Sequence, residues 1–127
     1  MYIRQNLKII ESLRTPEGIV TSFVRVQEIL DKIIADWSLQ RERPPNLRRH
    51  GLQFGWRTKD ELLRSVAFGK PLIDPAVVIS KTGETANLIA ALRTGAAPFP
   101  RMPLGGPFVG EPEILEIIDW INCGTPD

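Results

Sequence analysis

Proline interrupts this chain at short intervals, and its spacing limits how long any helix can be. The 127 residues include eleven prolines and ten glycines, and Pro98, Pro100, Pro103 and Pro107 fall within one short stretch. Proline lacks a backbone N–H and its ring collides with the preceding turn, so it ends or kinks a helix. Glycine marks turns between elements. The pattern therefore predicts short helices joined by long, shaped loops in a chain the size of one domain.

Apolar residues recur at helical spacing between these interruptions. Thr15 and Pro16 are expected to form the N-cap and first position of a helix, and Thr58 begins a pattern typical of a capping box. Residues 70–81 are predicted to be extended and irregular, because Pro71 and Pro75 resist a helix, with a short strand at Val77, Val78 and Ile79 as the alternative. The predicted helices span residues 6–14, 16–37, 58–68, 82–92 and 112–124. The sequence thus predicts an all-α domain of four to five short helices with an additional N-terminal helix.

The charge balance and the cysteine count exclude several classes of protein. Sixteen basic and fifteen acidic residues give a net charge of +1, so no overall field attracts nucleic acid or a membrane surface. The single cysteine, Cys123, excludes an internal disulfide and any site with several thiolates, and we expect a half-buried, inert thiol. The N-terminus has no apolar core of signal-peptide type, and no stretch approaches the roughly 20 apolar residues of a membrane span. We therefore expect a soluble, cytoplasmic protein.

Arginines gather in and beside one predicted loop, with aromatic residues between them. Such a cluster can grip phosphates, dock a partner protein or simply be solvated. The neutral overall charge makes nucleic acid an unlikely partner, so a protein contact or a solvated loop is the expected role. The cluster consists of Arg41, Arg43, Arg48, Arg49 and Arg57.

No arrangement of side chains in the sequence predicts catalysis. Ser22, Ser38 and Ser80 lack the G-x-S-x-G context of a nucleophile. The carboxylates lie at spacings that place them on solvent-facing helix surfaces, with no base or nucleophile as partner. We therefore predict that the chain is not an enzyme and has no metal site.

Several short motifs follow one another in an order shared with a known family. The segment "VRVQEILDKIIADWS" is a helical lead-in, "HGLQF" is a loop with a G-L pair, and "GETANLIAALRTG" is a short helix. In "RMPLGGPFVGEPEILEIIDWINCGTP", an M-P pair and a G-G pair precede a helix with a W-I pair. Together these motifs resemble the cytochrome c-like domain of bacterial multidomain and dehydrogenase-associated cytochromes, over about residues 24–126.

This resemblance implies a cytochrome c-like fold over residues 16–127, preceded by a helical extension over residues 1–15. It also implies that the last helix crosses the first long helix to close the domain. The side chains expected at that crossing are Ile114, Ile117, Ile118 and Ile121 against Val26, Leu30 and Ile33.

The residues that attach haem in this family are missing here. A c-type cytochrome needs C-x-x-C-H, whose thiols form thioethers and whose histidine binds iron. The corresponding window from Ile34 to Ser38 contains neither cysteine nor histidine, so covalent attachment is excluded. Met102 falls where the family has its distal methionine ligand. We expect a vestigial pocket that side chains now fill, with Trp37 as the plug and the remaining members Ile34, Ser38, Phe54, Trp56 and Met102.

Three functions remain open on these grounds. The first is a haem-free, protein-binding or structural module without a cofactor, whose partner is another protein or a second copy, with the helix over residues 6–14 as contact surface. The second is an electron-transfer or sensing protein that binds haem non-covalently through Met102, with or without His50. The third is a ligand carrier or small enzyme that reuses the vacated pocket, which requires an open apolar cavity lined by Trp37 and Met102.

Overall fold

The computed structural model describes residues 21–95 and 100–127. The predicted helix over residues 6–14, the extension over residues 1–15 and the predicted cap at Thr15 lie outside these ranges. The described part is mostly helical, with short helices and long loops, as predicted. Its elements are α1 (Phe23–Arg41), η1 (Leu47–His50), α2 (Lys59–Leu63), β2 (Val66–Ala67), β3 (Lys70–Pro71), α3 (Pro75–Ser80), η2 (Gly83–Thr85), α4 (Asn87–Arg93) and α5 (Glu111–Asn122).

The first long helix begins later and ends later than the sequence predicts. Ser22 is its N-cap, and the Ser22 side chain accepts a hydrogen bond from the backbone N–H of Arg25 at 3.3 Å. The helix passes Trp37 and continues to Arg41, where Glu42 closes it in the left-handed conformation. A serine N-cap can set a helix start as well as the predicted threonine–proline pair.

The predicted helix over residues 58–68 is wrong in its second half. Thr58 caps α2, as expected, by accepting a hydrogen bond from the Glu61 N–H at 3.0 Å. The helix stops at Leu63, and the chain then forms an antiparallel pair in which β2 lies against β3. Phe68 and Gly69 both have positive φ between these strands, and this conformation turns the chain back instead of extending the helix.

The prediction of irregular chain over residues 70–81 is also wrong, because Pro75–Ser80 forms α3. Asp74 is its N-cap, and the Asp74 side chain accepts a hydrogen bond from the Ala76 N–H at 2.9 Å. Pro75 occupies the first turn, where the absence of an N–H costs nothing. The proline therefore starts a helix here.

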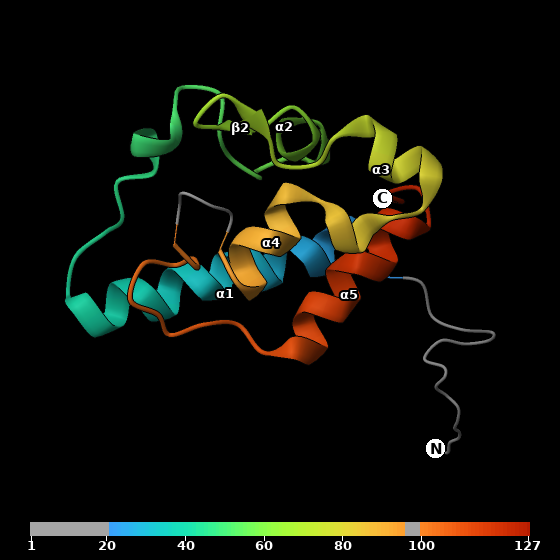
Figure 1. Cartoon of the computed structure of the whole chain (residues 1–127). Coiled ribbons are helices and arrows are strands. Elements are labelled where there is room, and N and C mark those ends of the chain that lie inside the picture. The colour runs from blue at the N-terminus through green and yellow to red at the C-terminus, as the bar shows by residue number, and fades with distance from the viewer. Residues whose placement is uncertain (1–20, 96–99) are drawn as a thin grey trace, which may run out of the picture.

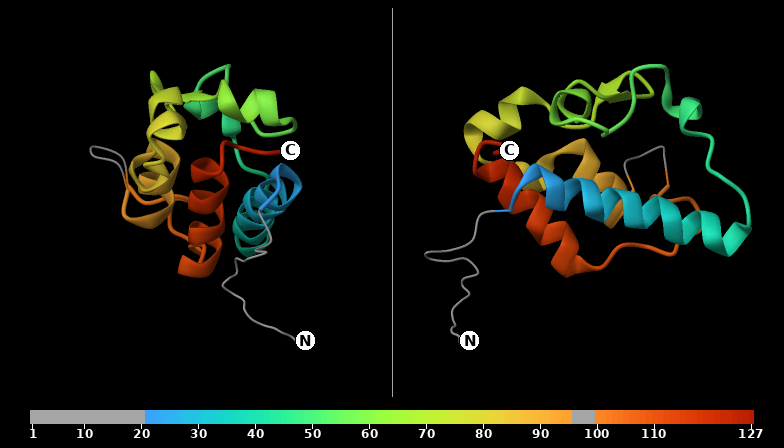
Figure 2. Two further views of the ribbon diagram at one scale, coloured as in Figure 1. Left: turned by 90° about the vertical axis from the view of Figure 1, so that its right-hand side faces the viewer. Right: turned by 180° about the vertical axis from the view of Figure 1, so that it is seen from behind.

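The elements form two tiers in Figure 1, and the rotated views in Figure 2 show the same arrangement. The lower tier contains α1, α4 and α5, and the upper tier contains η1, α2, the β2–β3 pair and α3. Helix α5 contacts α1, α3 and α4. The loop from α1 to η1 rises along one side and joins the tiers (Figure 1).

One hydrophobic core joins both tiers. Helix α5 contributes the expected isoleucines and Trp120, and α1 lies against it with Val26, Leu30 and Ile33 buried, as the resemblance implies. The Phe23 and Trp120 rings lie 6.1 Å apart between centroids. The upper tier adds Leu62, Leu72 and Ile73 to the same core.

Candidate functional site

An apolar cavity of about 520 Å³ lies between the two tiers. Pockets that hold drug-sized ligands have volumes of about 300–1,000 Å³. Its walls come from α1, η1, the β2–β3 pair, α4 and the loop that precedes α5. Its apolar lining includes Leu30, Ile33, Ile34, Trp37, Leu47, Phe54, Trp56, Ala67, Phe68, Leu72, Leu88, Ala91, Leu92 and Met102.

Two tryptophans belong to the wall, and each is anchored through its indole N–H. Trp37 donates to the carbonyl of Leu104 at 3.0 Å, and Trp56 donates to the Asp31 carboxylate at 2.8 Å. The Arg41 guanidinium also lies 4.7 Å from the Trp37 ring centroid. A buried or half-buried indole needs a partner for its N–H, and here the acceptors lie in the loop before α5 and on α1. The rings are therefore held at the perimeter of the cavity.

The expectation that side chains fill this pocket is wrong. Ile34, Trp37, Phe54, Trp56 and Met102 line one open cavity. Ser38, the sixth predicted member, is not among the lining residues. The sequence identified aromatic residues near the pocket correctly, but it could not show where their polar ends would find acceptors.

Gly55 fixes the loop that places Phe54 and Trp56 against the cavity. Its N–H donates to the Ser65 hydroxyl at 2.9 Å, and its carbonyl lies 2.7 Å from the same oxygen. Ser65 is 1% exposed. Because a Cβ at Gly55 would come within 2.8 Å of the Glu61 carboxylate, only glycine fits here without a shift of that side chain.

Replacing Ser65 with alanine is expected to lower the free energy of unfolding by about 1–3 kcal/mol, because the buried Gly55 N–H loses its partner. Urea unfolding measures the change. Ser80→Ala is the matched control, since the Ser80 hydroxyl is exposed to solvent, and its effect should stay within about 0.5 kcal/mol. If the two substitutions lower the free energy of unfolding equally, the Ser65 hydroxyl does not stabilise the loop as described.

His50 lies in η1 and faces the cavity with one ring nitrogen already engaged. Its ring stacks on Phe54 at 4.2 Å between centroids, with the planes 8° apart, and is tilted against Phe68. Nδ1 lies 3.2 Å from the carbonyl oxygen of Leu47. A neutral ring that donates Nδ1–H to this carbonyl keeps the lone pair of Nε2 for a ligand. The residue is half-buried and belongs to the wall.

Met102 lines the same cavity from the loop before α5. Its backbone N–H donates to the carbonyl of Ala91 at 2.7 Å, which fixes this loop to α4. Arg41 donates to the carbonyls of Leu104 and Gly106 at 2.9 and 2.8 Å and holds the next turn against α1. The structure therefore brings Met102 and His50, 52 positions apart in the chain, to one cavity.

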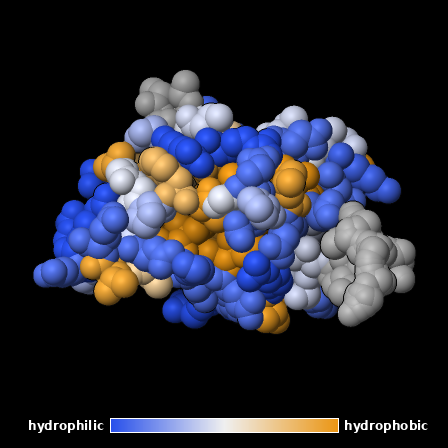
Figure 3. Space-filling model, turned by 90° about the horizontal axis from the view of Figure 1, so that it is seen from below, coloured by the Kyte–Doolittle hydropathy of each residue, from blue (hydrophilic) through white to orange (hydrophobic). Residues whose placement is uncertain are grey.

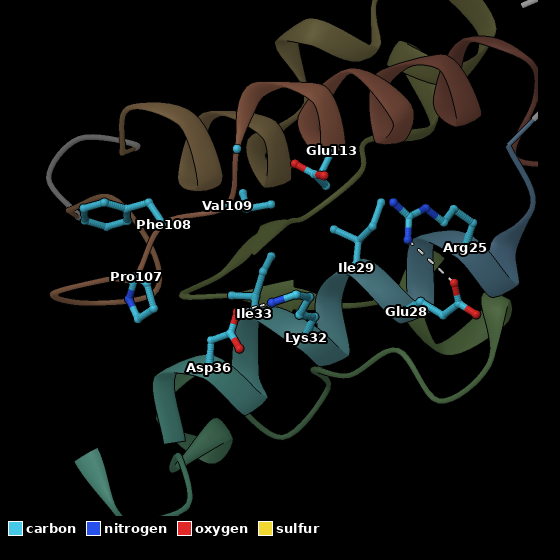
Figure 4. A pocket seen from close by; sticks show the side chains of 11 residues that line it. Arg25, Glu28, Ile29, Lys32, Ile33, Asp36, Pro107, Phe108, Val109 and Glu113 are labelled. Carbon is cyan, nitrogen blue, oxygen red and sulfur yellow. Dashed lines mark hydrogen bonds and ion pairs between the residues drawn. The ribbon is translucent and has the colours of Figure 1, made fainter. Parts of the chain in front are cut away.

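A second hollow, of about 340 Å³, lies between α1, α5 and the segment from Pro107 to Gly110. In the view from below, a hollow with a hydrophobic floor is surrounded by hydrophilic residues (Figure 3). The close-up shows Ile29, Ile33 and Val109 pointing toward one another among charged side chains (Figure 4).

The basic side chains around this second hollow, Arg25 and Lys32, are paired with carboxylates. Arg25 forms two hydrogen bonds with Glu116, at 2.8 and 2.9 Å, and Lys32 pairs with Asp36 at 2.6 Å. The hydrogen bonds to Glu116 raise the pKa of Arg25, which outweighs the lowering by burial. Because both basic side chains are paired, this hollow offers an anionic ligand no free positive charge.

The described residues provide neither a cluster of metal ligands nor a thiol in the cavity wall. Over residues 21–95 and 100–127, no group of three histidine, cysteine, aspartate or glutamate side chains could hold a metal ion. Cys123, the C-cap residue of α5, is exposed and not half-buried as expected. It is not among the residues of the cavity.

Sequence reasoning missed several wall residues. Ala67 of β2 and Phe68 of the turn between β2 and β3 line the cavity, and the sequence did not predict this strand pair. Leu88, Ala91 and Leu92 line it from α4. The apolar spacing in residues 82–92 carried a signal for these three, because it predicts that one face of that helix is buried.

No family model, curated protein or solved structure matches the chain. None of the helices that the structure describes has the length and apolar character needed to cross a membrane.

Proposed function

We propose that this chain is a cytochrome c-like domain that binds a small apolar ligand in its central cavity without covalent attachment. The observation that carries the proposal is the open cavity of about 520 Å³ bordered by Trp37, Trp56 and Met102. Apolar walls in contact with water are unfavourable, and a ligand that covers them gains about 25 cal/mol for each Å² removed from water. The anchored indoles keep the cavity open before a ligand arrives, so little reorganisation opposes binding.

The experiment is a titration of the full chain with phenylnaphthylamine, a neutral apolar dye that fluoresces in apolar surroundings. We expect saturable binding at one site. Because a ligand that binds only the folded state stabilises it, the free energy of unfolding should rise by about 2.7 kcal/mol at a dye concentration 100 times Kd. Binding that does not saturate, or that leaves unfolding unchanged, would contradict the proposal.

Non-covalent haem is a second candidate for the occupant. Met102 and His50 line the same cavity, and the engaged Nδ1 of His50 leaves the opposite nitrogen for iron. Methionine and histidine are the axial ligands of c-type haem iron, and the apolar walls suit a macrocycle. Bound there, haem would supply electron transfer or sensing. The residues present fit the group, which Met102 and His50 would hold.

Haemin separates the two candidates. If haem is the ligand, haemin added to the protein should give a sharp Soret band that is lost in Met102→Ala and in His50→Ala. Phenylnaphthylamine binding should survive both substitutions, because each removes one side chain from a much larger apolar wall. Protein that stays without a Soret band rejects haem and leaves the apolar site standing.

A role as a protein-binding module, with another protein or a second copy as partner, stays a prediction from the sequence. Its expected contact surface, the helix over residues 6–14, lies outside the described residues. Deletion of residues 1–14 followed by size-exclusion chromatography tests it, and a truncated chain that stays associated would reject that surface.

A further inference from the structure

Three cationic side chains stand where the cavity meets solvent. Arg43, Arg49 and Lys70 line the cavity and are all exposed. They come from three separate segments, namely the loop after α1, η1 and β3. No aspartate or glutamate is among the residues that line the cavity. The rim of the cavity therefore has three positive charges and no negatively charged side chain among the lining residues.

The three rim side chains do not anchor any loop in the described part of the chain, whereas the nearby Arg41 and Arg101 do. Arg41 and Arg101 donate to backbone carbonyls of Leu104, Gly106 and Leu92 and so hold loops in place. The side chains of Arg43, Arg49 and Lys70 form no ion pair with any residue that the structure describes. The Arg43 guanidinium lies 5.3 Å from the Trp37 ring centroid, which keeps it beside the cavity wall.

The rim charge does not follow from the overall composition. The whole chain has a net charge of +1, and the basic side chains of the second hollow are paired with carboxylates. The concentration of unpaired positive charge is therefore a local property of this cavity, and a ligand would meet it on entry.

We propose that the ligand is an amphipathic organic acid, with an apolar body inside the cavity and one anionic group at the rim. This inference rests on the proposed function, ligand binding in this cavity. Arginine and lysine form charge-assisted hydrogen bonds to carboxylates and related anions, and arginine can form two at once. The apolar walls accept the body of such a molecule, and the three cations accept its head. A cationic ligand with the same apolar body would be repelled by these three positive charges, and no carboxylate lines the cavity to pair with it.

A matched pair of dyes tests this inference on the full chain. Anilinonaphthalene sulfonate has the aromatic body of phenylnaphthylamine and adds one negative charge. We expect the wild-type chain to bind the anionic dye at least about tenfold more tightly than the neutral dye, a difference of about 1.4 kcal/mol. The preference should shrink as salt is added, because exposed charges are screened.

The triple variant Arg43→Gln, Arg49→Gln and Lys70→Gln should reduce the preference to near unity and leave neutral-dye binding unchanged. The control variant Arg57→Gln, Arg64→Gln and Lys81→Gln removes the same charge from residues that do not line the cavity and should keep the preference. Equal wild-type affinity for both dyes, or a preference that survives in the rim variant, overturns the inference and leaves the proposed function intact. Failure of both dyes to bind rejects the two together.

Discussion

Replacing Trp120 with alanine is expected to lower the free energy of unfolding by about 3–5 kcal/mol, the range for removing a large aromatic side chain from a core. Trp120 is 0% exposed and packs against Phe23. Its indole N–H donates to the carbonyl of Pro126 at 2.7 Å, and its own carbonyl accepts from the Thr125 N–H at 2.9 Å. The side chain therefore joins α1, α5 and the last residues of the chain.

The loss is large because domains are stable by only about 5–15 kcal/mol. Urea unfolding followed by far-ultraviolet circular dichroism measures it without relying on tryptophan fluorescence. Leu115→Ala is the control on the same helix, because Leu115 is 51% exposed, and it should cost less than about 1 kcal/mol. A cost below about 1 kcal/mol for Trp120→Ala would show that the core is assembled differently.

Filling the cavity is expected to abolish ligand binding without unfolding the protein. Ala67 and Ala91 are the alanines that line it, the first from β2 and the second from α4. Phenylalanine at both positions would project two rings into the space that a ligand needs. We expect affinity for phenylnaphthylamine to fall at least about 100-fold, or about 2.8 kcal/mol.

The free energy of unfolding of this double variant should change by less than about 1 kcal/mol, because the new rings enter open space and do not overpack a dense core. Ala35→Phe with Ala76→Phe is the matched control, since both alanines are exposed and neither lines the cavity. It should bind the dye as the wild-type chain does. Undiminished binding in the double variant at Ala67 and Ala91 would place the ligand elsewhere.

Local signals in the sequence were sufficient for part of the fold. The apolar spacing in α1 and α5 identified the helices that carry most of the core. The start of α2 followed from Thr58, whose hydroxyl caps the helix within one turn. These features depend on neighbours a few residues away, and such interactions can be read along the chain.

Features that depend on distant partners or on backbone conformation were missed. The β2–β3 pair depends on positive φ at Phe68 and Gly69. Helix α3 was missed although its signal is local, because Asp74 caps the first turn and Pro75 starts the helix instead of resisting it. Trp37 was predicted to be a plug, but its indole donates to Leu104, 67 positions away. The open cavity results from such long-range anchors, which residue type alone does not specify.

The indole signals of the three tryptophans test the central claim most directly, because they report where a ligand binds. In a nitrogen–proton correlation spectrum of the labelled full chain, single Trp→Phe variants assign each indole N–H. We predict that phenylnaphthylamine shifts the signals of Trp37 and Trp56, which line the cavity, and leaves that of the core residue Trp120 in place. If Trp37 and Trp56 stay unmoved while the dye binds, the cavity between the two tiers is not the ligand site.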